Sequence, residues 1–345
     1  MKKLAIIVLA SLLISSCQWS KKKQKSELTL TSIASSEKQW TGVALSQSKR
    51  IFVNYPYWSG HVPVSVAEIV NGVPRAYPNM AWNQRTGGQS FNAVQSVFVD
   101  DKDRLWVLDT NNPTFKGVQA GGPILFQFDL ESNQMIKSHS FPEGVYKSNS
   151  YFNDVRIDTH KEVAYMTDSG DGAIIVLNLE TGQAQRLLDD HASTQNEVDH
   201  LICDGIRWDN SVHSDGIALS PDRDYLYYIA LSAHTLYRIK TSALLNENLS
   251  LEELADQVEK VKTIPATDGM LFDKAGNLYL GGLETNAVNR LTVDGEFETV
   301  MQSPRIRWAD SFAMDQEGAL YFTTSQIHLP EKERVKYEVL KLNIE

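Results

Sequence analysis

The chain has 345 residues, of which 42% are hydrophobic, enough for one large folded domain. Its formal net charge is −10 at pH 7. Nucleic-acid binding needs a basic surface, so this negative net charge argues against a nucleic-acid partner. It favours cations, amines or neutral small molecules as partners.

The first residues have the features of a bacterial lipoprotein signal. Lys2 and Lys3 precede an apolar run over 4–14, which is too short to span a bilayer. The sequence Ile14-Ser15-Ser16-Cys17 resembles a lipobox, in which the cysteine is lipidated and the chain is cleaved just before it. A plain signal peptide cleaved at another position is the alternative.

This pattern predicts three parts of the chain: a signal peptide over 1–16, lipidated Cys17 with a polar tether over 17–27, and a folded domain over 28–345. Gln18 follows the cysteine, which favours the outer membrane, and several acyl chains anchor a protein stably. We therefore expect attachment to a bacterial membrane by lipid alone, facing the periplasm. Because Cys17 carries lipid in this interpretation, Cys203 has no partner for an intramolecular disulfide.

One sequence pattern recurs six times in the folded region. A polar and a small residue are followed by three alternating positions, a turn and an apolar strand. The copies begin at Thr41, Gln95, Asn153, Ser214, Thr267 and Ala309. Each copy reads as two β-strands around a turn, and the strands that follow give about four per unit, as in a propeller blade. The sequence predicts an all-β, six-bladed β-propeller.

Two insertions lengthen this pattern, one over 191–212 and one over 250–260. In the second, Ser250 and Glu253 form a capping box, which predicts one short helix on the outer face of the propeller. The apolar side of this helix is expected at Leu251, Leu254, Val258 and Val261. Closure of the propeller is expected from pairing of 28–33 with 337–342, because an open propeller would expose strand edges.

Six polar side chains occupy the same register of the inner strands. They are Thr41, Gln95, Asn153, Asp215, Asp268 and Asp310. Inner strands line the central channel, so these residues are expected to form an axial ring. Crowded carboxylates repel one another unless a cation or protons offset their charge. The alternative is that these residue types only cap turns.

The oxygen-only donors of the axial ring favour Ca²⁺ as a cofactor, with Mg²⁺ or Mn²⁺ as alternatives, and disfavour zinc. The predicted metal ligands are Asn153, Asp215, Asp268 and Asp310. Thr41 and Gln95 complete the ring.

Two other groups of residues have side chains that could carry chemistry. His200-x-x-Cys203, with His191 and His213 nearby, could begin a zinc site or hold a nucleophilic thiol. The spacing fits no standard pattern, so an ordinary insertion loop with a buried thiol is the preferred interpretation. Tyr55, Tyr57 and Trp58 could border the channel mouth, although packing is the preferred role.

Longer motifs resemble the major royal jelly protein and Yellow family, especially its bacterial members. They are FVNYPYWSGHVPVSVAEI at 52–69, RLWVLDT at 104–110, GGPILFQFDL at 121–130, SYFNDVRID at 150–158 and SDGIALSPDRDYLYYIALSAHTLYRI at 214–239. The resemblance covers nearly the whole folded domain. Members of this family have been linked to binding of biogenic amines in the channel and to dopachrome conversion. The resemblance therefore implies that an acidic ring could receive an ammonium group.

More distantly, the chain is similar to the gluconolactonase and senescence-marker group, calcium-dependent six-bladed propellers that hydrolyse sugar lactones. That group holds its metal with a Glu on blade one, Asn residues on middle blades and an Asp on a later blade. The resemblance implies that Asn153 is a ligand and that Asp268 is the catalytic Asp, while Asp215 stands where another Asn is usual. Thr41 occupies the register of the blade-one Glu, and Asp310 could supply the missing charge.

Three functions remain open at this point. In a lactonase, a metal would polarise the lactone carbonyl while Asp268 or Asp215 takes a proton from water. In an amine-binding protein, the acidic ring would receive an ammonium group directly. A protein interaction platform at the outer membrane would need no axial chemistry. In the first two cases the partner is a small molecule in the channel.

Overall fold

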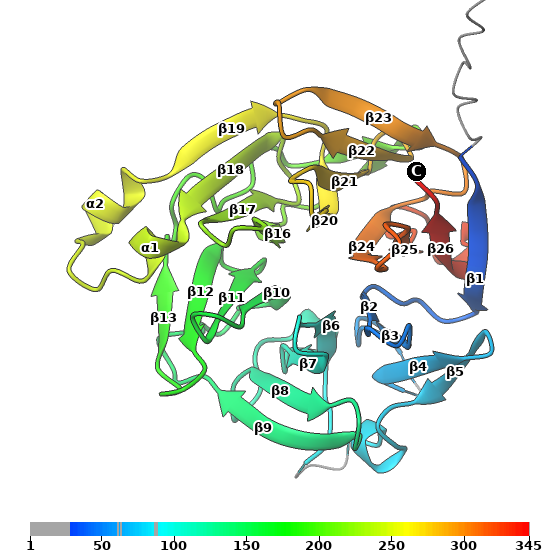
Figure 1. Ribbon diagram of the computed structural model, residues 1–345, viewed down its shortest axis with the longest axis horizontal. Coiled ribbons are helices and arrows are strands. Elements are labelled where there is room, and N and C mark those ends of the chain that lie inside the picture. Colours follow the sequence, from blue (N-terminus) through cyan, green and yellow to red (C-terminus); the bar gives the residue numbers. More distant parts are fainter. Residues whose placement is uncertain (1–27, 61, 63, 86–88, 345) are drawn as a thin grey trace, which may run out of the picture.

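The computed structural model describes residues 28–60, 62, 64–85 and 89–344. The expected signal peptide, Cys17 and the tether lie outside these residues. Six four-stranded antiparallel sheets are arranged around a central axis (Figure 1). The two inner strands of every blade come from one of the six sequence repeats, which confirms the predicted six-bladed propeller.

The first three blades follow the chain from the inner strand outward. Blade one contains β2 (Val43–Leu45), β3 (Ile51–Asn54), β4 (Val66–Val70) and β5 (Val73–Ala76). Blade two contains β6 (Val94–Val99), β7 (Arg104–Asp109), β8 (Ile124–Asp129) and β9 (Gln134–Ser140). Blade three contains β10 (Phe152–Asp158), β11 (Val163–Asp168), β12 (Ala173–Asn178) and β13 (Ala184–Leu187).

The last three blades repeat this order, except at the outer edge of blade six. Blade four contains β16 (Ser214–Leu219), β17 (Tyr225–Ala230), β18 (Thr235–Lys240) and β19 (Glu259–Thr263). Blade five contains β20 (Thr267–Phe272), β21 (Leu278–Gly282), β22 (Ala287–Leu291) and β23 (Phe297–Gln302). Blade six contains β24 (Ala309–Met314), β25 (Leu320–Thr324), β26 (Tyr337–Leu342) and β1 (Leu30–Ser36).

Blade six closes the propeller with strands from both ends of the described chain. β1 pairs antiparallel with β26, with Leu30 opposite Leu342 and Ser36 opposite Tyr337 (Figure 1). This confirms the predicted pairing of the two terminal segments. Closure gives the first and last blades the same lateral contacts as the other blades and leaves no open seam between them.

The first insertion forms a short hairpin of β14 (Leu201–Cys203) and β15 (Ile206–Trp208). The second contains α2 (Leu251–Ala255), preceded by α1 (Thr241–Leu244). Three single-turn 3₁₀ helices complete the structure, at Ala81–Asn83, Pro113–Phe115 and Glu331–Glu333. No helix in the described part of the chain is long and apolar enough to cross a membrane.

The capping box of α2 is confirmed, but the helix is shorter than predicted. The Ser250 hydroxyl accepts a hydrogen bond from the Glu253 N–H, and the Glu253 carboxylate accepts one from the Ser250 N–H. Leu254 is buried, whereas Leu251 is 74% exposed. Val261 belongs to β19, so the helix-like spacing of apolar residues in the sequence ran past the end of the helix into a strand.

The hydrophobic core lies between neighbouring blades. Between blades two and three, Trp106 and Leu108 of β7 pack in one cluster with Phe152 and Val155 of β10. Six such interfaces surround the axis, and burial of each large apolar side chain contributes about 1.5–3 kcal/mol. The blades are thereby fixed relative to one another, which positions the side chains on the axis.

Candidate functional site

Local irregularities in the inner strands turn the predicted ring residues toward the axis. In blades two to six, the inner strand carries a register shift near its start. The second residue of each of these strands lies within or beside the shift; these residues are Gln95, Asn153, Asp215, Asp268 and Asp310. A β-bulge interrupts the ladder and re-aims a side chain, so the same irregularity gives five blades the same projection.

Side chains from neighbouring blades hold the backbone of the axial ring. Asn54 Nδ2 donates to the Gln95 carbonyl at 2.9 Å, and Thr167 Oγ1 donates to the Asp215 carbonyl at 2.7 Å. The Thr323 hydroxyl donates in the same way to the carbonyl of Thr41. Each donor lies on the second strand of the preceding blade, so blade packing sets the position of the ring.

The inner strands of blades four, five and six approach too closely for a side chain after the ring residue. A Cβ added at Gly216 would lie 2.3 Å from the Asp268 carbonyl oxygen. A Cβ added at Gly269 would lie 2.3 Å from the Asp310 carbonyl oxygen. The repeated Asp-Gly pair therefore combines an axial carboxylate with the space that the next blade needs.

Five of the six predicted ring residues line one pocket of about 480 Å³. They are Gln95, Asn153, Asp215, Asp268 and Asp310. Thr41 is not among the residues that line this pocket. Its buried hydroxyl accepts a hydrogen bond from Asn54 Nδ2 at 3.0 Å, and the regular strand β2 begins only at Val43.

A chain of hydrogen bonds runs along one side of this axial pocket. Trp58 Nε1 donates to the Tyr151 hydroxyl at 2.6 Å, which donates to Gln95 Oε1 at 2.8 Å. Gln95 Nε2 donates to Asn153 Oδ1 at 3.0 Å, and Asn153 Nδ2 donates to Asp215 Oδ2 at 2.6 Å. An indole N–H can only donate, so it fixes the direction of the whole chain. Every donor is directed toward the carboxylate of Asp215.

The three carboxylates of the axial pocket are buried and perturb one another. Burial raises the pKa of Asp215 well above its usual value, and the charges of Asp154 and Asp310 add to the effect. Burial, then the charges of Asp310 and Asp215, raise the pKa of Asp268 in the same way. Burial raises the pKa of Asp310 to about 7. Without a bound cation, the three groups therefore hold protons at pH values where ordinary carboxylates are ionised.

A buried ion pair closes the channel below the axial ring. Arg156 Nη2 lies 3.4 Å from Asp154 Oδ2 and also donates to the Met270 carbonyl of β20 at 3.0 Å. Its side chain thus reaches from blade three to blade five, with the guanidinium carbon 5.5 Å from the centre of the Phe98 ring. Asp154 also accepts from Ser96 Oγ at 3.0 Å. The axial pocket is therefore blind at this end.

Sequence reasoning missed Asp154 and Arg156, although the repeat alignment contained the signal. Both are charged at positions where blades four and five have small or apolar residues. The position of Asp154 is Gly216 in blade four and Gly269 in blade five. The position of Arg156 is Ala218 in blade four and Leu271 in blade five. A charge in a register where the other blades have small or apolar residues indicates a special role on the axis.

The inserted hairpin β14–β15 covers part of the axial pocket. Trp208 lines the pocket and packs edge-on against Trp308, with ring centres 4.9 Å apart. Trp308 Nε1 donates to Asp268 Oδ2 at 2.7 Å, and its ring stacks on His328 at 5.7 Å. His328 Nε2 lies 3.0 Å from the carboxylate of Asp204 at the hairpin turn. The insertion is thus connected to a ring carboxylate.

A second group of aromatic side chains forms the opposite wall of the mouth. Phe115 packs against Trp58 and Tyr151, with ring centres 6.1 and 4.9 Å away. Phe115 is 59% exposed and has a φ of 56°, which is unusual for a bulky residue. Of the aromatic residues noted in the sequence, Trp58 lines the pocket. Tyr55 is buried in the core, which is the packing role that was expected for it.

The His and Cys residues of the first insertion are engaged separately. His191 Nδ1 contacts Ser193 Oγ at 2.7 Å, and His200 Nδ1 contacts Asp199 Oδ1 at 2.5 Å. Cys203 is buried, and burial raises the pKa of its thiol to about 12. Over the described ranges, no group of three or more His, Cys, Asp or Glu side chains is arranged to hold a metal ion.

The sequence model of the family described as Major royal jelly protein matches residues 92–344. This chain belongs to the major royal jelly protein family. Among relatives of this royal jelly family protein, Protein yellow of Drosophila madeirensis is 24% identical over 271 residues, 69% of this chain and 46% of that protein. Major royal jelly protein 5 of Apis mellifera is 25% identical over 268 residues, 72% of this chain and 42% of that protein. This chain spans less than half the length of both.

A third relative matches over more of its length. Yellow-related salivary protein LJM17 of Lutzomyia longipalpis is 24% identical over 332 residues, 86% of this chain and 79% of that protein. Two solved structures have the same fold as this royal jelly family protein. A gluconolactonase of Xanthomonas campestris matches with a TM-score of 0.60 and 13% identity, over 93% of this chain and 91% of that chain. Regucalcin of Agrobacterium tumefaciens, named a calcium-binding protein, matches with a TM-score of 0.57 and 13% identity, over 91% of this chain and 92% of that chain.

Proposed function

We propose that the axial pocket binds a small organic cation, an ammonium group carried by an aromatic body. The observation that carries this proposal is the convergence of three buried carboxylates, Asp215, Asp268 and Asp310, at one level of the channel. Their negative charge exceeds what the single guanidinium of Arg156 offsets, and that guanidinium is already paired with Asp154. A ligand that brings one positive charge removes repulsion that the protein otherwise relieves by taking up protons.

The chemistry of the pocket suits an ammonium group on an aromatic ring. An ammonium has three N–H donors, and the carboxylates of the ring are acceptors when ionised. Trp58, Phe115, Tyr151 and Trp208 line the pocket around these acceptors. Aromatic faces attract both a ring and a cation, the latter by about 0.5–2 kcal/mol. The pocket therefore offers an acidic floor and aromatic walls to one molecule.

A calcium-dependent lactonase is a second candidate, favoured by the position of Asn153, Asp215, Asp268 and Asp310 in one pocket. Calcium would supply a Lewis acid for a lactone carbonyl, and Asp268 or Asp215 would accept a proton from water. In the present arrangement, however, Asn153 Oδ1 accepts from Gln95 while Asn153 Nδ2 donates to Asp215. An amide oxygen accepts two bonds, so Oδ1 keeps only one lone pair for a metal, and the effect of a chelator separates the two candidates.

Calorimetry of the full chain with tyramine tests the proposal, with 4-ethylphenol as the neutral analogue. We expect tyramine to bind at pH 7.5 in the presence of a chelator. 4-Ethylphenol should bind at least about tenfold more weakly, and Asp215→Asn should weaken tyramine binding by a similar factor. The matched control is Asp294→Asn, an exposed carboxylate on the β22–β23 turn. Equal binding of both compounds would contradict the proposal. Lactone hydrolysis that requires added calcium would establish the second candidate.

We also propose that Cys17 holds the protein on the bacterial outer membrane, as the lipobox-like sequence suggests. Leu28 and Ile344 pack against one hydrophobic cluster between blades five and six, and Ile344 lies at the end of the channel opposite the axial ring. An anchor joined there would leave the axial pocket open toward the periplasm. Metabolic labelling with a fatty acid tests this proposal, and labelling that persists in Cys17→Ser would contradict it.

A further inference from the structure

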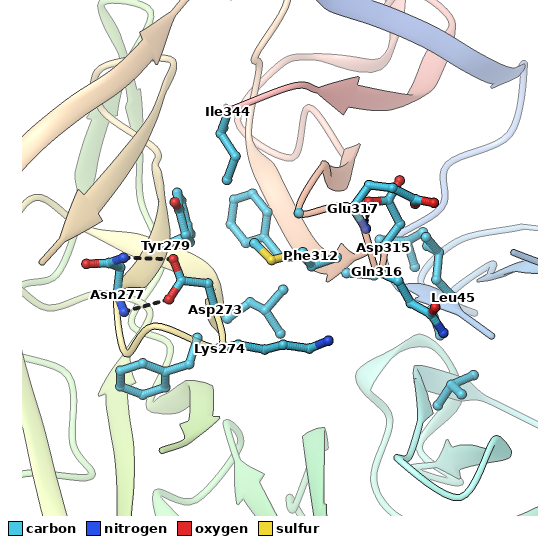
Figure 2. A pocket seen from close by; sticks show the side chains of 18 of the residues that line it. Leu45, Asp273, Lys274, Asn277, Tyr279, Phe312, Asp315, Gln316, Glu317 and Ile344 are labelled. Atoms are coloured by element: carbon cyan, nitrogen blue, oxygen red, sulfur yellow. Dashed lines mark hydrogen bonds between the residues drawn. The ribbon is translucent and has the colours of Figure 1, made fainter. Parts of the chain in front are cut away.

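A second cavity, separate from the axial pocket, lies at the opposite end of the channel. It has a volume of about 630 Å³ and is formed by the ends of β2, β6, β20 and β24 with the turns that follow them (Figure 2). We call it the lower cavity. Its lining shares no residue with that of the axial pocket. The Arg156 side chain lies between the two, since it packs over Phe98, whose ring also lines the lower cavity.

The lining of the lower cavity combines apolar side chains with charged and polar ones. Large side chains that are only half buried line it, namely Leu45, Phe98, Leu271, Phe272, Met314 and Ile344. Apolar walls with a few polar groups, in a cavity of about 300–1,000 Å³, are typical of small-molecule sites. A ligand that covers these side chains would gain about 25 cal/mol for each Å² removed from water.

The carboxylates around the lower cavity already have partners within the protein. Asp100 accepts from Arg104 Nε at 2.8 Å, and Glu317 accepts from Lys49 Nζ at 2.7 Å. Asp273 accepts from its own turn, including Asn277 Nδ2 at 2.8 Å. Asp315 and Asp101 are paired with Lys341 and Arg223. These charges are therefore largely satisfied without a ligand.

Lys274 differs from these groups. Within the described residues it has neither a hydrogen bond nor an ion pair, and the same holds for the side-chain amide of Gln316. Figure 2 shows the Lys274 side chain extended across the pocket, with its ammonium end toward Gln316. The lower cavity thus offers one unpaired cation and one free amide donor beside an apolar wall.

We infer that the lower cavity is a binding site for a small amphipathic anion, an apolar molecule that carries one carboxylate. Its apolar part would cover Phe98, Leu271 and Met314, and its carboxylate would accept hydrogen bonds from Lys274 and Gln316. A charge-assisted hydrogen bond at the edge of an apolar surface gives both orientation and affinity. The two ends of the channel would then select ligands of opposite charge. This inference does not depend on amine binding in the axial pocket.

The test is calorimetry of the full chain with 4-phenylbutyrate, compared with neutral 4-phenylbutanol. We expect 4-phenylbutyrate to bind, and both the loss of its charge and the substitution Lys274→Met to weaken binding by at least about tenfold. Lys260→Met, which removes an exposed lysine from the outer strand β19, is the matched control and should leave binding unchanged.

Two further variants separate this inference from the proposed function. Met314→Glu places a negative charge on the wall of the lower cavity and should also abolish binding of 4-phenylbutyrate. Asp215→Asn, in the axial pocket, should weaken tyramine binding and leave 4-phenylbutyrate binding unchanged. No binding of 4-phenylbutyrate, equal binding by the Lys274→Met variant, or competition between 4-phenylbutyrate and tyramine would overturn the inference.

Discussion

Replacing Asp310 with Asn should stabilise the protein at alkaline pH and have little effect in acid. Burial raises the pKa of this carboxyl from its usual 3.8 to about 7 in the folded state. Below about pH 4 the group is protonated in both the folded and the unfolded chain, so it does not affect stability. Between about pH 4 and 7 the unfolded chain loses this proton while the folded chain keeps it, so the free energy of unfolding falls as pH rises.

The size of the effect follows from the shift in pKa. Each unit corresponds to about 1.4 kcal/mol, so ionisation of Asp310 should cost the folded state roughly 4 kcal/mol above pH 7. Asn keeps the shape of the side chain without the charge. The Asp310→Asn variant should therefore exceed the wild type in stability by up to about 4 kcal/mol near pH 8, and by almost nothing near pH 4.

Urea unfolding followed by tryptophan fluorescence measures this difference in dialysed protein with a chelator present. Asp294→Asn, which changes an exposed carboxylate, supplies the control. A wild type that equals or exceeds Asp310→Asn in stability near pH 8 would refute the reasoning, and so would a difference that is constant with pH. Saturating tyramine should reduce the difference, since a bound ammonium stabilises only the ionised ring.

Three other predictions test separate parts of the architecture. Gly216→Ala should lower the free energy of unfolding by about 2 kcal/mol, because its Cβ would lie 2.3 Å from the Asp268 carbonyl oxygen; an unchanged melting temperature would count against this contact. Burial raises the pKa of the Cys203 thiol to about 12, so in the Cys17→Ser variant a thiol reagent at pH 8 should modify Cys203 only in urea, and rapid labelling of that variant in its native state would be inconsistent with burial. Arg156→Met leaves Asp154 unpaired and should cost about 3–5 kcal/mol, part of which Asp154→Ser should restore.

The sequence was sufficient to predict the repeats and therefore the fold. Each inner hairpin is a local unit, with alternating apolar residues around a turn, so its strands could be placed without knowledge of its neighbours. Equivalent residues of equivalent hairpins occupy equivalent places in a closed propeller, which is why Asn153, Asp215, Asp268 and Asp310 could be assigned to one level of the axis. Helical spacing was less reliable, because at Val261 a strand continued the apparent period of α2.

The tertiary structure alone decided which side chains complete the axial pocket. Thr41 shares the register of the ring, but Asn54 binds its hydroxyl outside the pocket, and the regular strand of blade one begins only at Val43. Trp208 reaches the pocket through an insertion that no repeat predicts, and Arg156 closes the channel by contacting a carbonyl 114 residues away. Such contacts join residues that are distant along the chain. Local sequence patterns determine strands and registers, whereas the packing of whole blades determines which groups meet on the axis.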